Sequence, residues 1–174
     1  MSTTRASIVL SSERVFDRHG FAATGMDRLT QEAGVSSRTL YKHLGSKDSL
    51  VAAVLSARAE RFFAAFDVRG VDALFSTLAA WTASEGARGC LFLRALAETG
   101  GDVPGVVTAV ADYRDRLVAL VRRAVVDDLD REDELLAEQV LVLFEGAVSA
   151  ASYRGGDALV AARAAATALV RLAG

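Results

Sequence analysis

The sequence contains very few of the residues that build disulfides, metal sites and helix breaks: one cysteine, one proline and two histidines in 174 residues. The lone Cys90 cannot form an internal disulfide, which is typical of a protein in the reduced cytoplasm. A place in the core is a more common role for such a cysteine than redox sensing. His19 and His43 lie far apart in the sequence, so we expect no metal site and no cofactor.

Segments that would target or cross a membrane are also missing. The N-terminus has no apolar stretch of about 7–15 residues followed by small residues, so no signal peptide is expected. The longest apolar candidate, Leu135–Tyr153, carries Glu138 and Glu145, and we interpret it as a buried helix rather than a membrane span. A glycine-rich phosphate loop and a nucleophile paired with a base are absent too, which argues against an enzyme.

What the chain has in abundance is alanine, leucine and valine, and apolar residues make up 52% of it. Alanine and leucine favour helix and alternating patterns are rare, so we predict an all-α fold of about nine helices. Residues 1–66 hold nine Lys/Arg and six Asp/Glu (+3), whereas residues 67–174 hold eleven and sixteen (−5). The first part is therefore the one expected to meet an anionic partner.

Apolar spacings of three and four residues, bounded by capping residues and glycine, predict where the helices lie. Thr24 is expected to cap the second helix, Gly34 to end it, and Ser36 and Ser46 to cap the next two. Pro104 suits the first turn of a helix, where its missing N–H is not needed. The predicted helices span residues 4–19, 26–33, 37–43, 47–66, 71–84, 89–99, 104–128, 132–152 and 157–173.

The segment MDRLTQEAGVSSRTLYKHL, residues 26–44, combines two short predicted helices joined by a tight turn that begins at a glycine. Leu29, Val35 and Leu40 are placed to pack between these helices. Polar side chains line the second helix, and a helix presented in this way fits the major groove of DNA. We therefore expect double-stranded DNA to be the partner of the first part of the chain.

Residues 8–55 resemble the N-terminal domain of the TetR (tetracycline-repressor) family of bacterial transcriptional regulators. GCLFLRALAE, residues 89–98, is similar to a helix of many members. The chain departs from the family pattern at Gly25, Thr30 and Leu44, where Thr, Ala and Phe are usual. The matching positions are Val15-Phe16, Gly20-Phe21, Thr24, Leu29, Ala33-Gly34-Val35-Ser36, Thr39-Leu40-Tyr41, His43 and Ser46-Lys47-Asp48-Ser49-Leu50.

The resemblance implies which residues contact DNA. In the family a Tyr, a His and a Lys clamp phosphates, and by position these are Tyr41, His43 and Lys47. The second helix of the motif reads bases, and Arg38 is the residue best suited to a guanine edge. The full expected set is Thr24, Ser36, Ser37, Arg38, Thr39, Tyr41, Lys42, His43 and Lys47.

The rest of the chain is expected to hold a small-molecule effector. Such sites are mostly apolar with a few placed polar groups, and a plain hydrophobic core is the alternative interpretation of the same residues. The candidates for lining the site are Trp81, Phe92, Leu96, Tyr113, Leu117, Phe144 and Val148. The polar groups available to orient a ligand are Arg94, Thr108, Tyr113, Arg114 and Glu145.

The last two predicted helices carry more apolar surface than one small module can cover. Small residues let helices approach closely, so a two-fold four-helix interface with a second copy is expected. The residues of this surface are Val140, Phe144, Ala147, Ala151, Leu159, Ala162, Ala166, Leu169 and Val170.

The predicted organisation is a helix-turn-helix domain (1–46), a connecting helix (47–69) and an effector-binding and dimerisation domain (70–174). The predicted function is that of a TetR-like regulator, a repressor, which binds palindromic operator DNA as a homodimer and is released by a small-molecule effector. A DNA-binding dimer without an effector is the alternative. No membrane partner is expected.

Overall fold

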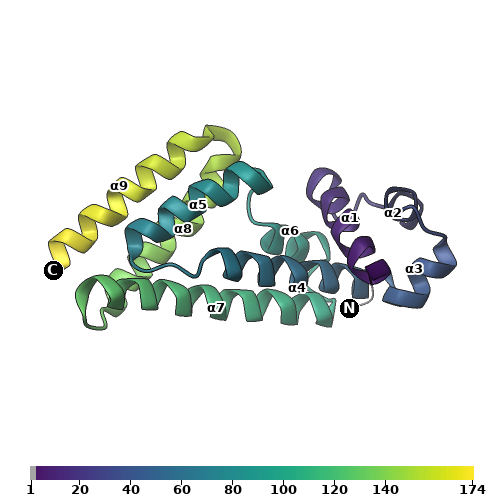
Figure 1. Ribbon diagram of the computed structural model, residues 1–174, viewed down its shortest axis with the longest axis horizontal. Helices are drawn as coiled ribbons and strands as arrows, with labels where there is room; N and C mark the ends of the chain where they lie inside the picture. The colour runs from purple at the N-terminus through teal and green to yellow at the C-terminus, as the bar shows by residue number, and fades with distance from the viewer. Residues whose placement is uncertain (1–2) are drawn as a thin grey trace. The chain divides into compact units, whose positions relative to one another are not determined.

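The computed structural model describes residues 3–174, and nine α-helices account for most of this part of the chain (Figure 1). The predicted all-α fold is confirmed, since no strand occurs among these residues. The helices are α1 (Thr3–His19), α2 (Met26–Ala33), α3 (Ser37–Leu44), α4 (Lys47–Ala65), α5 (Val71–Glu85), α6 (Leu91–Glu98), α7 (Pro104–Leu129), α8 (Glu134–Arg154) and α9 (Gly156–Ala173).

Several helix boundaries follow the local chemistry from which they were predicted. Gly34 ends α2 in the left-handed conformation, at φ 63°. The Ser36 side chain caps α3 by accepting a hydrogen bond from the backbone N–H of Thr39. Ser46 does the same for α4, where the N–H of Ser49 donates to its Oγ at 3.0 Å.

One predicted cap is wrong. The N-cap of α2 is Gly25, which has no side chain to accept a hydrogen bond. Thr24 faces inward instead, and its hydroxyl donates to the carbonyl oxygen of Gly20 at 2.6 Å. Thr24 therefore closes the turn between α1 and α2 and leaves the first N–H groups of α2 without a side-chain cap.

The later helices are displaced by a few residues from the predicted ranges. α8 begins at Glu134 rather than at residue 132, because Asp133 accepts a hydrogen bond from the N–H of Leu136 at 3.0 Å and acts as the cap. α7 runs on to Leu129, through the start of the predicted break. The break between α8 and α9 narrows to the single residue Gly155.

The chain forms two compact units. The first contains the chain up to Arg61 together with Leu91–Tyr113, and the second contains Phe62–Cys90 together with Arg114–Gly174. This division differs from the predicted one at residues 46 and 69. It does so because α6 belongs with the N-terminal helices, and because α4 and α7 each contribute residues to both units.

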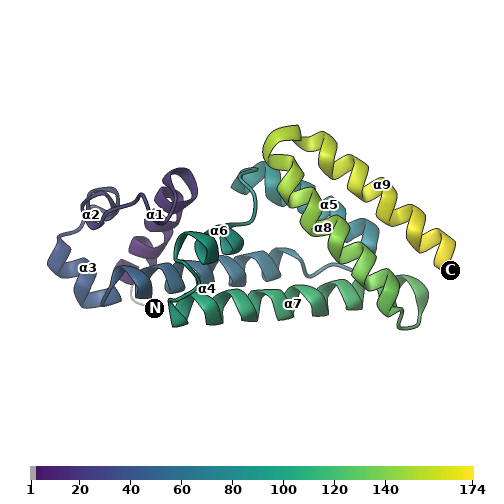
Figure 2. The ribbon, with the colours of Figure 1, turned by 180° about the vertical axis from the view of Figure 1, so that it is seen from behind.

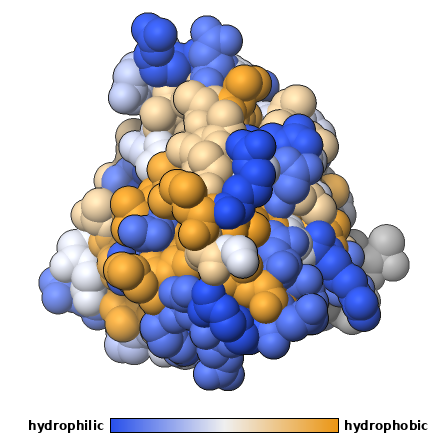
Figure 3. Space-filling model, turned by 90° about the vertical axis from the view of Figure 1, so that its left-hand side faces the viewer, coloured by the Kyte–Doolittle hydropathy of each residue, from blue (hydrophilic) through white to orange (hydrophobic). Residues whose placement is uncertain are grey.

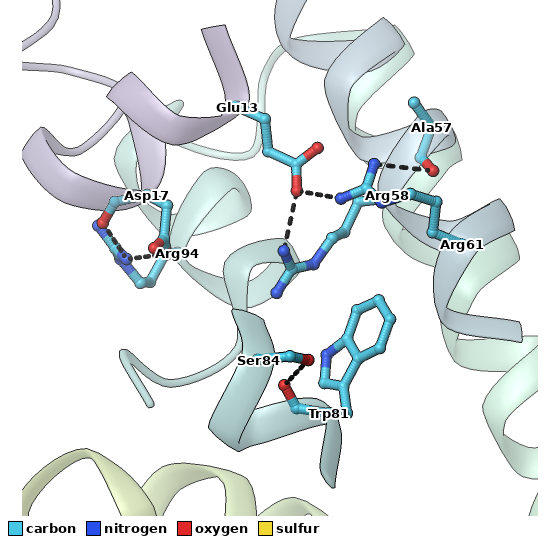
Figure 4. A network of polar contacts seen from close by, with 8 residues as sticks. All are labelled: Glu13, Asp17, Ala57, Arg58, Arg61, Trp81, Ser84 and Arg94. Carbon is cyan, nitrogen blue, oxygen red and sulfur yellow. Dashed lines mark hydrogen bonds and ion pairs between the residues drawn. The ribbon is translucent and has the colours of Figure 1, made fainter. Parts of the chain in front are cut away.

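In the first unit, α1, α2 and α3 pack on one another around fully buried apolar side chains (Figure 1). Phe16 and Phe21 stack with ring centroids 4.8 Å apart, and Leu29 and Leu40 lie between α2 and α3 as predicted. A buried acid joins α1 to α4. The Glu13 carboxylate, 5% exposed, accepts hydrogen bonds from Arg58 at 2.8 Å and from Arg61 at 2.6 Å (Figure 4).

In the second unit, α5, α8 and α9 pack together (Figure 2). An aromatic cluster fills the centre of this unit, with Phe62 stacked on Phe66 at 4.1 Å and Phe144 edge-on to Phe66 at 5.9 Å. At the surface, Arg163 of α9 makes two hydrogen bonds, at 2.7 and 2.6 Å, to the Asp72 carboxylate of α5.

Candidate nucleic-acid interface

One side of α3 presents a polar stripe to solvent. Ser37, Arg38, Tyr41 and Lys42 are all exposed, and their spacing of one, three and one residues puts them on the same face of the helix. Leu40 and Leu44, on the other side, are buried. The apolar side therefore fixes α3 on the first unit, and the hydrogen-bonding side is left open for a partner.

The stripe is positively charged. Residues 36–47 contain three Lys/Arg and no Asp/Glu. Tyr41 is 48% exposed, and His43 and Lys47 are half-buried at the end of α3 and the start of α4. Cationic and hydroxyl groups beside a protruding helix are the types of group that contact the phosphates of a DNA duplex.

The first turn of α3 is held by its own side chains. Ser36 Oγ accepts from the N–H of Thr39 at 3.2 Å and lies 2.9 Å from the Thr39 hydroxyl. Both hydroxyls are thus engaged in capping, whereas Ser37 and Arg38 point outward without such a bond among the described contacts. Base contacts from this turn therefore fall more readily to Ser37 and Arg38 than to Thr39.

Thr24 does not join this surface. Its side chain is fully buried, and its hydroxyl is already bonded to Gly20. The expected phosphate contact has no exposed atom to make it, and we leave Thr24 out of the proposed interface. The remaining expected contacts all lie on α3, on its cap or at the first residue of α4.

The sequence analysis missed a set of polar contacts behind this surface. Glu98, at the end of α6, accepts hydrogen bonds from the backbone N–H groups of Phe21 and Ala22. Arg94 donates to the carbonyl oxygen of Asp17 at 3.1 Å (Figure 4). An acidic residue at the C-terminal end of a helix, where the dipole disfavours negative charge, was the available signal.

The expected effector-site residues do not fall into one unit. Phe92, Leu96 and Tyr113 belong to the first, whereas Trp81, Leu117, Phe144 and Val148 belong to the second. Phe92 and Tyr113 stack with centroids 3.8 Å apart and an interplanar angle of 6°, so these two rings fill each other's space. Arg94 is engaged with Asp17, and the side chains exposed to solvent are Thr108, Arg114 and Glu145.

The expected dimer residues are mostly buried inside their own protomer. Val140, Phe144, Ala147 and Ala166 are at most 3% exposed, so they form core and not an outer face. The same correction applies to Ala151, Leu159 and Ala162. These residues face the other helices of the second unit, and the small-residue pattern identified the packed side of α8 and α9.

A different side of α8 and α9 is apolar and open. Two grooves of about 560 and 440 Å³ run between these helices and share Val142, Leu143 and Ala165. Val142 is 62% exposed and Leu135 70% exposed. Figure 3 faces the end of the molecule at which α9 ends and α7 turns into α8, and apolar side chains gather there among charged ones.

By length and composition, α8 is long and apolar enough to cross a membrane. Its most apolar 18-residue window is 33% buried. The helix also carries Glu138 and Glu145, and its inner side packs on α5 and α9. A core helix of a protein without a membrane segment has the same properties, so this observation is weak evidence for a membrane span.

Comparison with known proteins places these features. The family model for "Bacterial regulatory proteins, tetR family" matches residues 8–54, from α1 into α4. The HTH-type transcriptional activator FasR of Mycolicibacterium smegmatis is 41% identical over 51 residues, which make up 29% of this chain and 23% of FasR. The chain thus matches less than a quarter of the length of that relative.

Solved structures match almost the whole chain. The TetR-family transcriptional regulator SCO4454 from Streptomyces coelicolor superposes with a TM-score of 0.83 at 25% identity, over 98% of this chain and 96% of that one. NemR of E. coli, in its reduced form, has a TM-score of 0.80 at 19% identity over 95% of each chain, which is a likeness of fold. The chain belongs to the TetR family of bacterial transcriptional regulators.

Proposed function

We propose that the protein is a repressor that binds palindromic operator DNA as a homodimer and leaves it when a small-molecule effector binds. The observation that carries the proposal is the exposed, positively charged stripe of α3, backed by buried Leu40 and Leu44. The TetR family consists of regulators and not of enzymes, so the enzyme alternative is dropped. The protein would act in the cytoplasm, where its operator lies.

The DNA contacts divide into two kinds. Tyr41, His43 and Lys47 lie beside the base of α3 and would bind phosphates, which fix the register of the protein on the duplex. On α3 itself, Ser37, Arg38 and Lys42 would reach base edges in the major groove, with Thr39 next to them. Ser36 contributes chiefly through the cap that starts the helix.

The dimer would form through the open side of α8 and α9. Small side chains line much of it, among them Gly146, Ala161 and Ala165, and they allow two helix pairs to approach closely. The larger apolar side chains, Val142 and Leu135, would be removed from water. A two-fold dimer could then hold its reading helices about 34–36 Å apart, one turn of DNA.

An effector would act by binding one of two dimer conformations more tightly than the other. α4 and α7 each contribute to both compact units, which offers a covalent route from the second unit to the first. The half-buried Trp81 and its aromatic neighbours Phe62 and Phe66 are the candidates for an aromatic ligand wall. Leu117, Phe144 and Val148 of the same unit remain candidates for the rest of the lining.

The alternative is a dimer that binds DNA without an effector. A thermal-shift panel of metabolites and drugs separates the two, because a ligand that binds the folded protein raises the unfolding temperature. No shift with any compound favours the alternative. The printed name of FasR is that of an activator, so a reporter assay on the target promoter decides between repression and activation.

The DNA-binding claim is tested by the dependence of affinity on salt. A duplex is first selected from a random pool by the wild-type protein, and its affinity is then measured at several salt concentrations. Tyr41→Ala and Lys47→Ala are expected to weaken binding, and Lys47→Ala to reduce the slope of log K against log salt by about 0.9. Tyr153→Ala, which removes an exposed tyrosine of α8, is the matched control. Variants that bind like the wild type would contradict the interface.

A further inference from the structure

The turn between α1 and α2 has a fixed internal structure. Phe21 is buried and stacks on Phe16 of α1. The Thr24 hydroxyl donates to the carbonyl oxygen of Gly20 at 2.6 Å, which closes the turn on itself. α2 begins directly after it, at Met26. Any displacement of the turn is therefore passed to α2 and, through the contacts between α2 and α3, to the reading helix.

A carboxylate from a distant part of the sequence holds this turn. Glu98, the last residue of α6, accepts hydrogen bonds through Oε2 from the N–H of Phe21 at 2.6 Å and from the N–H of Ala22 at 2.9 Å. Both donors are backbone groups of the turn that lie outside any helix. Hydrogen bonds to an ionised acceptor are shorter and stronger than those between neutral groups.

The fit between the carboxylate and the turn is close. A Cβ atom added to Gly20 would lie 2.8 Å from Glu98 Oε2, so the approach requires a glycine. The φ of Gly20, +84°, requires one as well. One turn of α6 earlier, Arg94 donates to the carbonyl oxygen of Asp17 at 3.1 Å and lies 3.5 Å from its carboxylate. α6 therefore holds both the end of α1 and the turn that follows it.

Glu98 has no evident value for α6 itself. Negative charge at the C-terminal end of a helix faces the negative end of the helix dipole. The pair with Arg94 on the same helix is long, 3.9 Å, and has the less favourable order for two residues four apart. The favourable contacts of this carboxylate are those to the turn.

We propose that Glu98 is a positioning residue for DNA recognition, whose carboxylate holds the α1–α2 turn, and through it α3, in the place required by the operator. The proposal rests on the proposed function, since it concerns how the DNA-binding helices are held. It makes α6 the element through which a change elsewhere in the first unit reaches the reading helix.

The test compares Glu98→Ala with Glu98→Gln, and uses Glu134→Ala as a matched control that breaks a surface ion pair with Arg122. The first readout is hydrogen exchange of the Phe21 and Ala22 amides in the DNA-free protein. Glu98→Ala should speed exchange of these two amides by about tenfold or more, while the amides in the middle of α1 keep their protection. Glu98→Gln retains an acceptor oxygen and should restore part of the protection.

The second readout is discrimination between the selected duplex and the same duplex with one base pair inserted between its half-sites. A loosely held head tolerates altered spacing, so the ratio of the two affinities should fall in Glu98→Ala, partly recover in Glu98→Gln and stay unchanged in Glu134→Ala. Unchanged amide exchange, or faster exchange with an unchanged affinity ratio, overturns the role of Glu98. A wild-type protein that selects no duplex overturns the proposed function itself and the recognition role with it.

Discussion

Ser36 and Thr39 hold each other at the start of α3. The Thr39 N–H donates to Ser36 Oγ at 3.2 Å, and the two hydroxyl oxygens lie 2.9 Å apart. The bond satisfies one of the N–H groups that the first turn of a helix leaves without a partner. The helix proposed to read DNA is thus stabilised by a residue next to the reading surface.

Ser36→Ala should lower the free energy of unfolding by about 1 kcal/mol, the usual cost of losing an N-cap. Ser36→Gly should cost only a few tenths, about 0.3 kcal/mol, since glycine is itself tolerated as a cap. Chemical denaturation of the three proteins measures the difference. Ser7→Ala, at an exposed position inside α1, is the control; an equal effect of Ser7→Ala and Ser36→Ala would mean that the cap contributes nothing.

Glu13→Ala should be the most destabilising of the substitutions considered. It removes a buried carboxylate that accepts hydrogen bonds from both Arg58 and Arg61. Breaking such a buried pair costs about 3 kcal/mol or more, with solvent access to Arg61 lowering the figure. Glu13→Gln keeps an acceptor and should lose less. Equilibrium urea unfolding measures both, with Glu145→Gln at an exposed site of α8 as the control. A loss below about 1 kcal/mol for Glu13→Ala, the size of an ordinary surface pair, would show that the α1–α4 link is not structural.

The ion pair between Asp72 and Arg163 makes stability depend on pH. The hydrogen bonds from Arg163 lower the pKa of Asp72 below its ordinary value. A carboxyl group with a lowered pKa in the folded state stabilises the protein above its unfolded-state pKa of about 3.9, and this contribution is lost as the pH falls through the folded-state pKa. Asp72→Asn should therefore flatten the drop in melting temperature below about pH 4. An acid limb identical to that of the wild type would remove Asp72 from this account.

The proposed dimer predicts that a charge in the open groove of α8 and α9 separates the protomers. Val142→Arg places a cation in the middle of an apolar face and should convert a dimer into a monomer in analytical ultracentrifugation. Val107→Arg, at a half-exposed apolar position of α7 in the first unit, should not. If both variants sediment as the wild type does, the interface lies elsewhere.

The sequence was most informative where local chemistry decides the structure. Ser36, Gly34 and Ser46 could be assigned as caps because a hydroxyl or a glycine acts on its own few neighbours. Thr24 was misassigned because its hydroxyl bonds back to Gly20, and the capping pattern alone cannot distinguish the two directions. Glu98 could not be paired with Phe21 from the sequence, since the two residues are 77 positions apart.

The sequence could not separate the two sides of α8 and α9. Both carry alanine and valine at helical spacing, so the pattern identified an apolar side without saying whether it faces the same chain or a second one. Val140 and Ala166 proved to be core, and Val142 and Ala165 lie on the open side. Packing against α5 decides between them, and this contact is not encoded in either helix alone.

The most direct test of the central claim, that the exposed side of α3 reads base pairs, is to measure Arg38→Ala against a panel of duplexes. Each duplex carries one base-pair change in the palindrome selected by the wild-type protein. The account predicts that the wild type discriminates at each half-site and that Arg38→Ala loses about 1–3 kcal/mol of discrimination at one symmetric position while keeping the others. Discrimination identical to that of the wild type at every position would contradict the claim.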